Sequence, residues 1–185
     1  MDLLVTGIGD AFSDRSYGSS ALVRGGGTWI GIDCPGMVLA MWRQAAERAG
    51  ISIDPREVGD LVITHLHGDH CAGLETIGFY HRYKIEGDSP RPRLHAIPEV
   101  LDRIWERLAP AMDGSGSGIE DYFELHPLRP GAEVEIAGCR VESRMTRHSV
   151  PTCGLVISDD SGCLGWSSDT EFDLEHLRWL DRADC

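Results

Sequence analysis

Residues 64–70 read Thr64-His65-Leu66-His67-Gly68-Asp69-His70 and follow an apolar stretch, so that three imidazoles and a carboxylate lie within one short segment. His65 and His67 are two positions apart, and in an extended segment both rings leave the same face. Asp69 and His70 follow a turn that Gly68 permits and can point to a second place nearby. Zinc and similar divalent ions prefer imidazole and carboxylate ligands. A polar loop that happens to contain histidines is the simpler alternative, but this order favours a metal site, with more ligands than one ion needs.

The same segment resembles the His-x-His-x-Asp-His signature of the metallo-β-lactamase-fold hydrolases, which lies at the end of a strand in that family. Residues 5–12 and 18–20, with the apolar stretch that ends in Asp33 and Cys34, resemble the opening hairpin of the family and its buried Asp. His148 and the tripeptide Ser168-Asp169-Thr170 occur where the family has a single His ligand and a bridging Asp. The resemblance covers essentially the whole chain. It implies an α/β fold, a four-layer αββα metallo-β-lactamase sandwich with metals at one edge between its two sheets.

The resemblance also implies a set of metal ligands: His65, His67 and His148 for one ion, Asp69 and His70 for a second, and Asp169 as the bridge between them. Taken alone, His148 after the alternating stretch 139–145 would be a capping or surface residue, and Asp169 would be the N-cap of a following helix. The order of the whole set favours ligands. Two divalent ions are expected, with zinc first, while manganese and iron also fit. Asp69 is in addition the candidate catalytic group, because a carboxylate beside the attacking water is placed for acid–base work.

The family continues beyond the segment that corresponds to residues 180–184 into a buried strand and a loop with a last His, which completes the second metal site. This chain ends at Cys185, and we expect its fold to lack that C-terminal portion. A fragment, a ligand from another polypeptide, or a second ion held by fewer protein groups would each account for the difference. His176 lies in a helix predicted over 172–180, and we interpret it as a surface residue of that helix.

Residues around the predicted ligands have supporting roles. Asp33 follows a buried strand and is a candidate to orient the ligand imidazoles through hydrogen bonds. It could equally hold its own loop by side-chain to backbone bonds. The six cysteines are scattered and no export signal precedes them, so we predict free thiols. Cys71 fits a small buried side chain at the start of a helix better than a ligand.

Length and composition predict one domain over residues 1–185. No apolar stretch approaches the ~20 residues that span a bilayer, and the N-terminus lacks the features of a signal peptide. We therefore expect a cytoplasmic protein without membrane contact.

The net charge of −13 disfavours binding to bulk nucleic acid. A phosphate substrate stays compatible because divalent ions supply positive charge at the site. Dimerisation is common among relatives, and a homodimer is left open.

Strand patterns occur before about residue 64 and again between 132 and 169, with helical material between and after them. Strands are predicted over 60–64, 139–145 and 164–168. Helices are predicted over 36–50, 72–80, 98–108 and 172–180. The segment 113–118, which alternates Gly with Ser after Asp113, is predicted to be loop.

The continuation 74–84 resembles the branch of the family that contains ribonuclease Z and cyclic-nucleotide phosphodiesterases. We therefore predict a metal-dependent hydrolase that cleaves a nucleotide or another small phosphodiester. His81, Arg82 and Lys84 could contact phosphate, although a solvated helix face is the simpler interpretation. Residues 71–147 contain no Gly-Pro-rich insertion like the tRNA-binding arm of ribonuclease Z, which disfavours tRNA processing. A lactonase or thioester hydrolase with the same metals, and a catalytically silent metal-binding or interaction module, are the alternatives.

Overall fold

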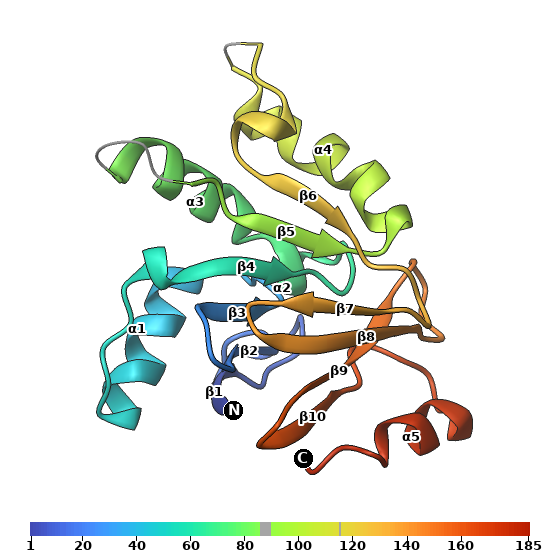
Figure 1. The fold of residues 1–185 in the computed structure, drawn as a ribbon. Coiled ribbons are helices and arrows are strands. Elements are labelled where there is room, and N and C mark those ends of the chain that lie inside the picture. The colour runs from blue at the N-terminus through green and yellow to red at the C-terminus, as the bar shows by residue number, and fades with distance from the viewer. Residues whose placement is uncertain (86–89, 115) are drawn as a thin grey trace.

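The computed structural model describes residues 1–85, 90–114 and 116–185. Within these residues the strands form two sheets (Figure 1). The larger sheet has the order β1 (Asp2–Gly7), β2 (Ser20–Arg24), β3 (Trp29–Ile32), β4 (Val58–Val62), β5 (Arg93–Ala96) and β6 (Glu124–Pro127). The smaller sheet has the order β10 (Gly162–Trp166), β9 (Cys153–Asp159), β8 (Cys139–Met145) and β7 (Glu133–Ile136).

Helices cover the outer faces of these sheets. They are α1 (Val38–Ala49), α2 (Gly68–Cys71), α3 (Leu74–Phe79), α4 (Pro98–Met112) and α5 (Leu174–Leu180), with the 3₁₀ turns η1 (Pro55–Glu57) and η3 (Ile119–Asp121) and the π-helix η2 (Tyr80–Lys84). Figure 1 shows α1, α3 and α4 beside the larger sheet and α5 beside the smaller one. The Trp179 indole near the end of α5 donates to Glu142 of β8 at 3.0 Å. This order of layers confirms the predicted αββα sandwich.

The larger sheet is parallel from β3 to β6. Leu61, Val62 and Ile63 are consecutive and fully buried, as expected where a parallel strand is covered on both faces. Ile32 of this sheet and Ile157 of the smaller sheet belong to one hydrophobic cluster. Because parallel strands end at the same edge of a sheet, the residues that follow β3 and β4 emerge side by side. Ligand sites of α/β folds lie at such an edge.

Most predicted elements are confirmed, with shifted ends. The predicted strand 139–145 is β8, and the predicted helices 36–50, 98–108 and 172–180 correspond to α1, α4 and α5. The strand predicted over 60–64 lies two residues earlier, and α2, α3 and η2 replace a single helix over 72–80. The described residues of 113–118 contain no helix or strand, as predicted, and residue 115 lies outside the described residues. The sequence did not predict β5 and β6, which lie in a region expected to be helical.

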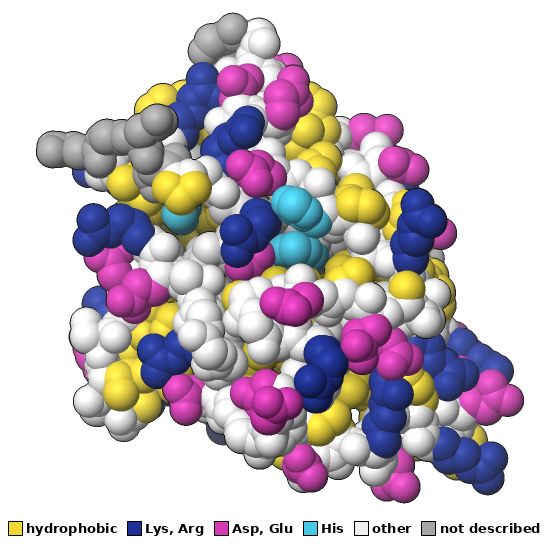
Figure 2. Space-filling view, viewed as in Figure 1, with side chains coloured by type: hydrophobic (Ala, Val, Ile, Leu, Met, Phe, Trp, Pro, Cys, Tyr) yellow, Lys and Arg dark blue, Asp and Glu magenta, His cyan; other side chains and the backbone are white. Residues whose placement is uncertain are grey.

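The lengths of the helices, the charges of the surface and the state of the cysteines bear on the predictions made from composition. None of the helices in the described part of the chain has the length and apolar content needed to cross a bilayer. On the face shown in Figure 2, the Lys and Arg side chains alternate with Asp and Glu, and its described residues form no continuous basic surface. All six cysteines are free, as predicted. Cys71 is buried, and its thiol donates to the His67 carbonyl at 3.1 Å.

Candidate metal centre

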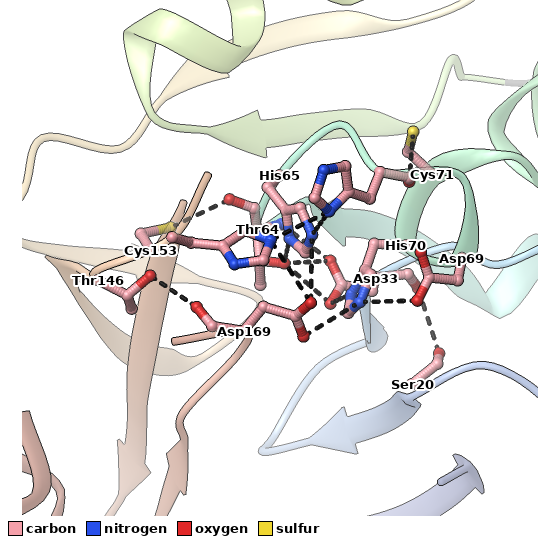
Figure 3. A network of polar contacts seen from close by, with 12 residues as sticks. Ser20, Asp33, Thr64, His65, Asp69, His70, Cys71, Thr146, Cys153 and Asp169 are labelled. Carbon is pink, nitrogen blue, oxygen red and sulfur yellow. Dashed lines mark hydrogen bonds and ion pairs between the residues drawn. The ribbon is translucent and has the colours of Figure 1, made fainter. Parts of the chain in front are cut away.

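Three strand ends bring the predicted ligands together. His65 and His67 follow β4, and Asp69 and His70 belong to α2. His148 follows β8, and Asp169 follows β10. Since β8 and β10 both pair antiparallel with β9, they run in the same direction and end at the same edge. The Cys153 amide at the start of β9 donates to the Thr64 carbonyl at 3.2 Å, and this bond joins the two sheets beside the site. Figure 3 shows the resulting cluster.

A first group of possible metal donors consists of His65, His67, His148 and Asp169, whose ligand atoms all lie within 4.8 Å of one another. His67 Nδ1 lies 3.1 Å from His65 Nε2 and 3.0 Å from His148 Nε2. Asp169 Oδ2 lies 3.8 Å from His65 Nε2 and 3.6 Å from His148 Nε2. The three imidazoles and one carboxylate oxygen therefore face a common point.

A second group lies on the other side of Asp169. His70 Nε2 is 3.4 Å from Asp169 Oδ1 and 3.5 Å from Asp69 Oδ2. Asp169 thus turns one oxygen toward each group. The remaining histidines of the described residues have other partners or positions: His81, His95, His126 and His176. The second group consequently has three donor residues where the first has four, counting Asp169 in both.

Asp33 holds the imidazoles of both groups from behind (Figure 3). Its carboxylate is fully buried and accepts from the Thr64 amide at 2.9 Å, from the Thr64 hydroxyl at 2.9 Å and from His70 Nδ1 at 2.8 Å. Because the Thr64 hydroxyl gives its proton to Asp33, its oxygen is left to accept from His65 Nδ1, 3.0 Å away. In the neutral form of each ring the proton then lies on Nδ1, and Nε2 faces the cluster.

The two interpretations of Asp33 made from the sequence are both correct. The carboxylate orients the His70 imidazole, and it also binds the backbone of the segment that follows β4. Asp33 has a positive φ of 58°, a conformation that Asp adopts more readily than most residues. Thr64 was not singled out from the sequence. A Thr directly before the first ligand His was the only signal for it, and the need for a bond to the buried Asp33 could not be seen without the fold.

Electrostatics differ between the two groups. Burial, reinforced by the neighbouring His70, His67 and His148, lowers the pKa of His65 to about 3. This imidazole is therefore neutral at physiological pH, the form that binds metals. Burial would also lower the pKa of His70, but the hydrogen bond and charge of Asp33 outweigh it and raise that pKa above its usual 6.5. Asp69 and Asp169 add to the same effect.

The donor set fits a divalent ion. Tetrahedral zinc with bonds of ~2.0–2.1 Å to nitrogen places its ligand atoms ~3.3–3.4 Å apart. The spacing of 3.0–3.8 Å among the first group brackets that value. Unprotonated ring nitrogens that face one another at such distances repel each other unless a proton or a cation lies between them. A cation among these ring nitrogens would remove that repulsion, and neutral imidazole with carboxylate suits zinc, manganese or iron.

Two interpretations of the C-terminal segment can be compared with the structure. Asp169 is not a helix cap, because Asp173 caps α5 by accepting from the amides of Glu175 and His176. His176 was predicted to lie on the surface, and this prediction was wrong. Its side chain is fully buried, and Nε2 donates to the Ser167 carbonyl at 3.1 Å. The helical pattern misled because the apolar residues Leu174 and Leu177 of this helix are exposed while the polar His176 is buried.

The candidate phosphate-binding residues of segment 81–84 contact other parts of the fold. The Arg82 guanidinium lies over the Tyr122 ring, 4.7 Å from its centroid, and 3.8 Å from the Asp121 carboxylate. His81 is buried rather than solvated. Figure 1 shows that α3 leads away from the edge where β4 ends. His81 therefore does not belong to the solvated helix face that was the simpler interpretation, and Arg82 is paired with Asp121 and Tyr122.

Comparison with known proteins gives a family and a fold. The sequence model of a family described as "Anti-Pycsar protein Apyc1" matches residues 1–185. The Anti-Pycsar protein Apyc1 of Saccharibacillus brassicae is 32% identical over 188 residues, which cover 98% of this chain and 72% of that protein. The metallo-β-lactamase fold protein YhfI from Bacillus subtilis superimposes with a TM-score of 0.79 at 15% identity, covering 98% of this chain and 68% of YhfI.

Human tRNase Z, short form, has the same fold, with a TM-score of 0.68 at 18% identity over 97% of this chain and 74% of that chain. At these identities the structural matches establish the fold only, and they confirm the resemblance inferred from the sequence motifs. The match of the family model extends over every residue of the chain. The chain therefore belongs to the Anti-Pycsar protein Apyc1 family, on the metallo-β-lactamase fold.

Proposed function

We propose that this protein hydrolyses the phosphodiester of a small nucleotide at a centre of two divalent metal ions. Its family and fold make the chain a metal-dependent hydrolase of the phosphodiesterase type. The number of ions, their ligands and the substrate are the proposed part. We assign the ions to these ligands: His65, His67 and His148 for the first, Asp69 and His70 for the second, and Asp169 for both.

The observation that carries the proposal is the position of Asp169. Its Oδ2 faces His65 and His148, while its Oδ1 faces His70. A single-metal site would need only one of these oxygens, and the second donor group would have no purpose. A carboxylate divided between two groups of donor side chains is the arrangement expected of a bridging ligand.

The side chains around the centre have separable roles. When bound, a pair of divalent ions supplies water of lowered pKa and positive charge for the phosphate oxygens. Thr64 accepts from His65 Nδ1 and Asp33 accepts from His70 Nδ1, so each Nε2 faces the cluster and is the nitrogen that a bound ion would contact. Asp69, whose side chain is 17% exposed, is the carboxylate we assign to hold the proton of the attacking water and to orient that water toward phosphorus.

A small substrate fits the surroundings of the site. A cavity of about 420 Å³ lies between the metal-ligand loops and α4 and is lined by Leu66, Glu99, Val100, Arg103, Glu106, Arg107, Val150 and Pro151. Cavities of ~300–1,000 Å³ are typical of small-molecule sites. The net charge of −13 and the mixed charges of the visible face (Figure 2) favour a small nucleotide over a nucleic acid.

The proposal is tested by measuring metal content and hydrolysis together. Elemental analysis of the dialysed protein should give two ions per chain. Hydrolysis should be detected with a bis-aryl phosphodiester and with cyclic mononucleotides, and should be slower with a lactone or a thioester. Asp169→Asn should lower the metal content and abolish most of the hydrolysis, because an amide oxygen is a weaker bridging ligand than a carboxylate.

Asp173→Asn is the matched control. Asp173 lies four residues after Asp169 and caps α5, and Asn caps a helix as well as Asp does. This variant should keep the metal content and the rates of the unmodified chain. One ion per chain would refute the dinuclear centre. Faster turnover of the lactone or thioester than of any phosphodiester would refute the substrate class.

A further inference from the structure

We propose that His176 is a positioning residue for the metal centre, acting through the turn that carries Asp169. This inference rests on the ligand role proposed above for Asp169. The imidazole is fully buried under α5, and its Nε2 donates to the carbonyl of Ser167, two residues before Asp169. The surface position predicted for His176 from the sequence gave it no such role.

The turn between β10 and α5 holds a strained residue. Ser168 has a positive φ of 54°, which is uncommon for a residue with a Cβ. Its hydroxyl is buried, and it has no hydrogen-bond partner among the described residues, so the side chain does not stabilise this conformation. Such a backbone persists only where its surroundings enforce it. The enforcing contacts on either side are the bond from His176 to the Ser167 carbonyl and the bond from the Thr146 hydroxyl to the Asp169 carbonyl, 2.8 Å long.

Gly154 of β9 lies directly against the hydrogen bond between His176 and the Ser167 carbonyl. A Cβ at Gly154 of β9 would lie 2.6 Å from His176 Cε1, 2.9 Å from His176 Nε2 and 2.9 Å from the Ser167 oxygen. A methyl group there would occupy the place of the hydrogen bond itself. Gly154 and His176 are therefore two independent points at which the same bond can be broken.

The hydrogen bond from His176 to the Ser167 carbonyl adds little net stability to the fold. Nδ1 of His176 is buried and has no hydrogen-bond partner among the described residues. Leaving a buried acceptor unpaired costs as much as, or more than, an ordinary neutral hydrogen bond contributes. An apolar side chain of similar size would fill the site without that cost. What His176 provides and an apolar residue cannot is the N–H that fixes the Ser167 carbonyl, and with it the direction in which Asp169 points.

The roles of packing and positioning predict opposite results for His176→Leu. If His176 positions Asp169, the zinc affinity measured by competition with a chelator should fall about 10-fold or more, as when other residues that orient metal ligands are replaced. The urea midpoint of the metal-free protein should not fall. The absorption spectrum of the Co²⁺-substituted protein should also change, because Asp169 contacts the ion from a different direction.

Three further variants make the test decisive. His176→Gln retains an N–H near the position of Nε2 and should recover most of the affinity lost in His176→Leu. Gly154→Ala should lower the affinity alone but add little in the His176→Leu background, because both break one bond. His81→Leu replaces another buried histidine, outside the two donor groups, and should leave zinc affinity unchanged.

Asp169→Asn separates this inference from the proposed function. If zinc affinity is unchanged in Asp169→Asn, the ligand assignment itself is wrong. If Asp169→Asn loses affinity while His176→Leu keeps the affinity and the cobalt spectrum of the unmodified chain, only the positioning role is refuted. A lower urea midpoint for His176→Leu with unchanged affinity would likewise show that His176 only packs.

Discussion

Replacing Asp33 by Asn should weaken metal binding while leaving the fold intact. Asp33 is fully buried and accepts from the Thr64 amide, the Thr64 hydroxyl and His70 Nδ1, at 2.9, 2.9 and 2.8 Å. Asn is the suitable replacement because it tolerates the positive φ of 58° at this position. Its amide has one accepting oxygen, so its NH₂ group must face one of these donors.

The magnitude follows from the number of bonds lost. Whichever way the amide turns, either His70 or, through Thr64, His65 loses the acceptor that fixes its ring. One hydrogen bond to a charged group contributes about 1.5–3 kcal/mol, and about 1.4 kcal/mol corresponds to a tenfold change in a binding constant. We expect zinc affinity to fall about 10- to 100-fold, within the range for residues that orient metal ligands.

The assay is zinc titration of the metal-free protein against a chelator of known affinity. Asp60→Asn provides a control, since Asp60 is equally buried and accepts from His95 Nε2 at 2.8 Å, away from the metal cluster. That variant should lose stability but not zinc affinity. A folded Asp33→Asn protein with the zinc affinity of the unmodified chain would refute the role given to Asp33.

Three further predictions concern stability. Burial would raise the pKa of Asp60, but the hydrogen bonds from His95 and the neighbouring arginine outweigh burial and lower that pKa below its usual 3.8. The ionised Asp60 therefore contributes fully to the free energy of unfolding above about pH 4. This contribution is lost as the pH falls through the pKa of the folded state. Asp60→Asn should lower the unfolding free energy at pH 7 by about 2–4 kcal/mol, and its urea midpoints at pH 7 and pH 3 should differ less than those of the unmodified chain. Gly73→Ala should destabilise by about 3 kcal/mol or more, because its Cβ would lie 2.2 Å from the Pro35 carbonyl oxygen, whereas Gly36→Ala, which meets nothing within 4 Å, should change the urea midpoint little. Removing the metal should lower Tm by about 5–11 °C relative to protein with free metal near 100 times Kd; equal melting curves with and without chelator would contradict a metal site in the folded state.

The meeting of the predicted ligands could be expected from the resemblance to the metallo-β-lactamase fold family, and the strand patterns before His65 and His148 agree with it. Thr64 to His70 are contiguous, and the alternating stretch before His148 has the period of β8. The place of Asp169 in the ligand order of that family grouped it with them. These residues are brought together by the register of the sheets, and that register is encoded in strong local signals.

The missed features depend on tertiary contacts. The strands β5 and β6 have four residues each, too few to show a period, and they form by pairing beside β4. His176 is buried and donates to the Ser167 carbonyl, while two leucines of its helix are exposed. A hydrophobic pattern cannot reveal a polar side chain that is buried for its hydrogen bond.

The donor residues of the proposed metal centre come from segments that are far apart along the chain, and this separation has a consequence for biosynthesis. His67 and His148 lie 81 residues apart and yet face each other at 3.0 Å, and Asp169 comes later still. A ribosome that adds about 5–20 residues per second needs about 4–16 s to synthesise that interval. During this time the early histidines have emerged without their partners and without the sheet that orients them. We therefore expect the proposed metal centre to be completed late in maturation, and the first ion to reach the nascent histidines need not be the one retained by the finished protein.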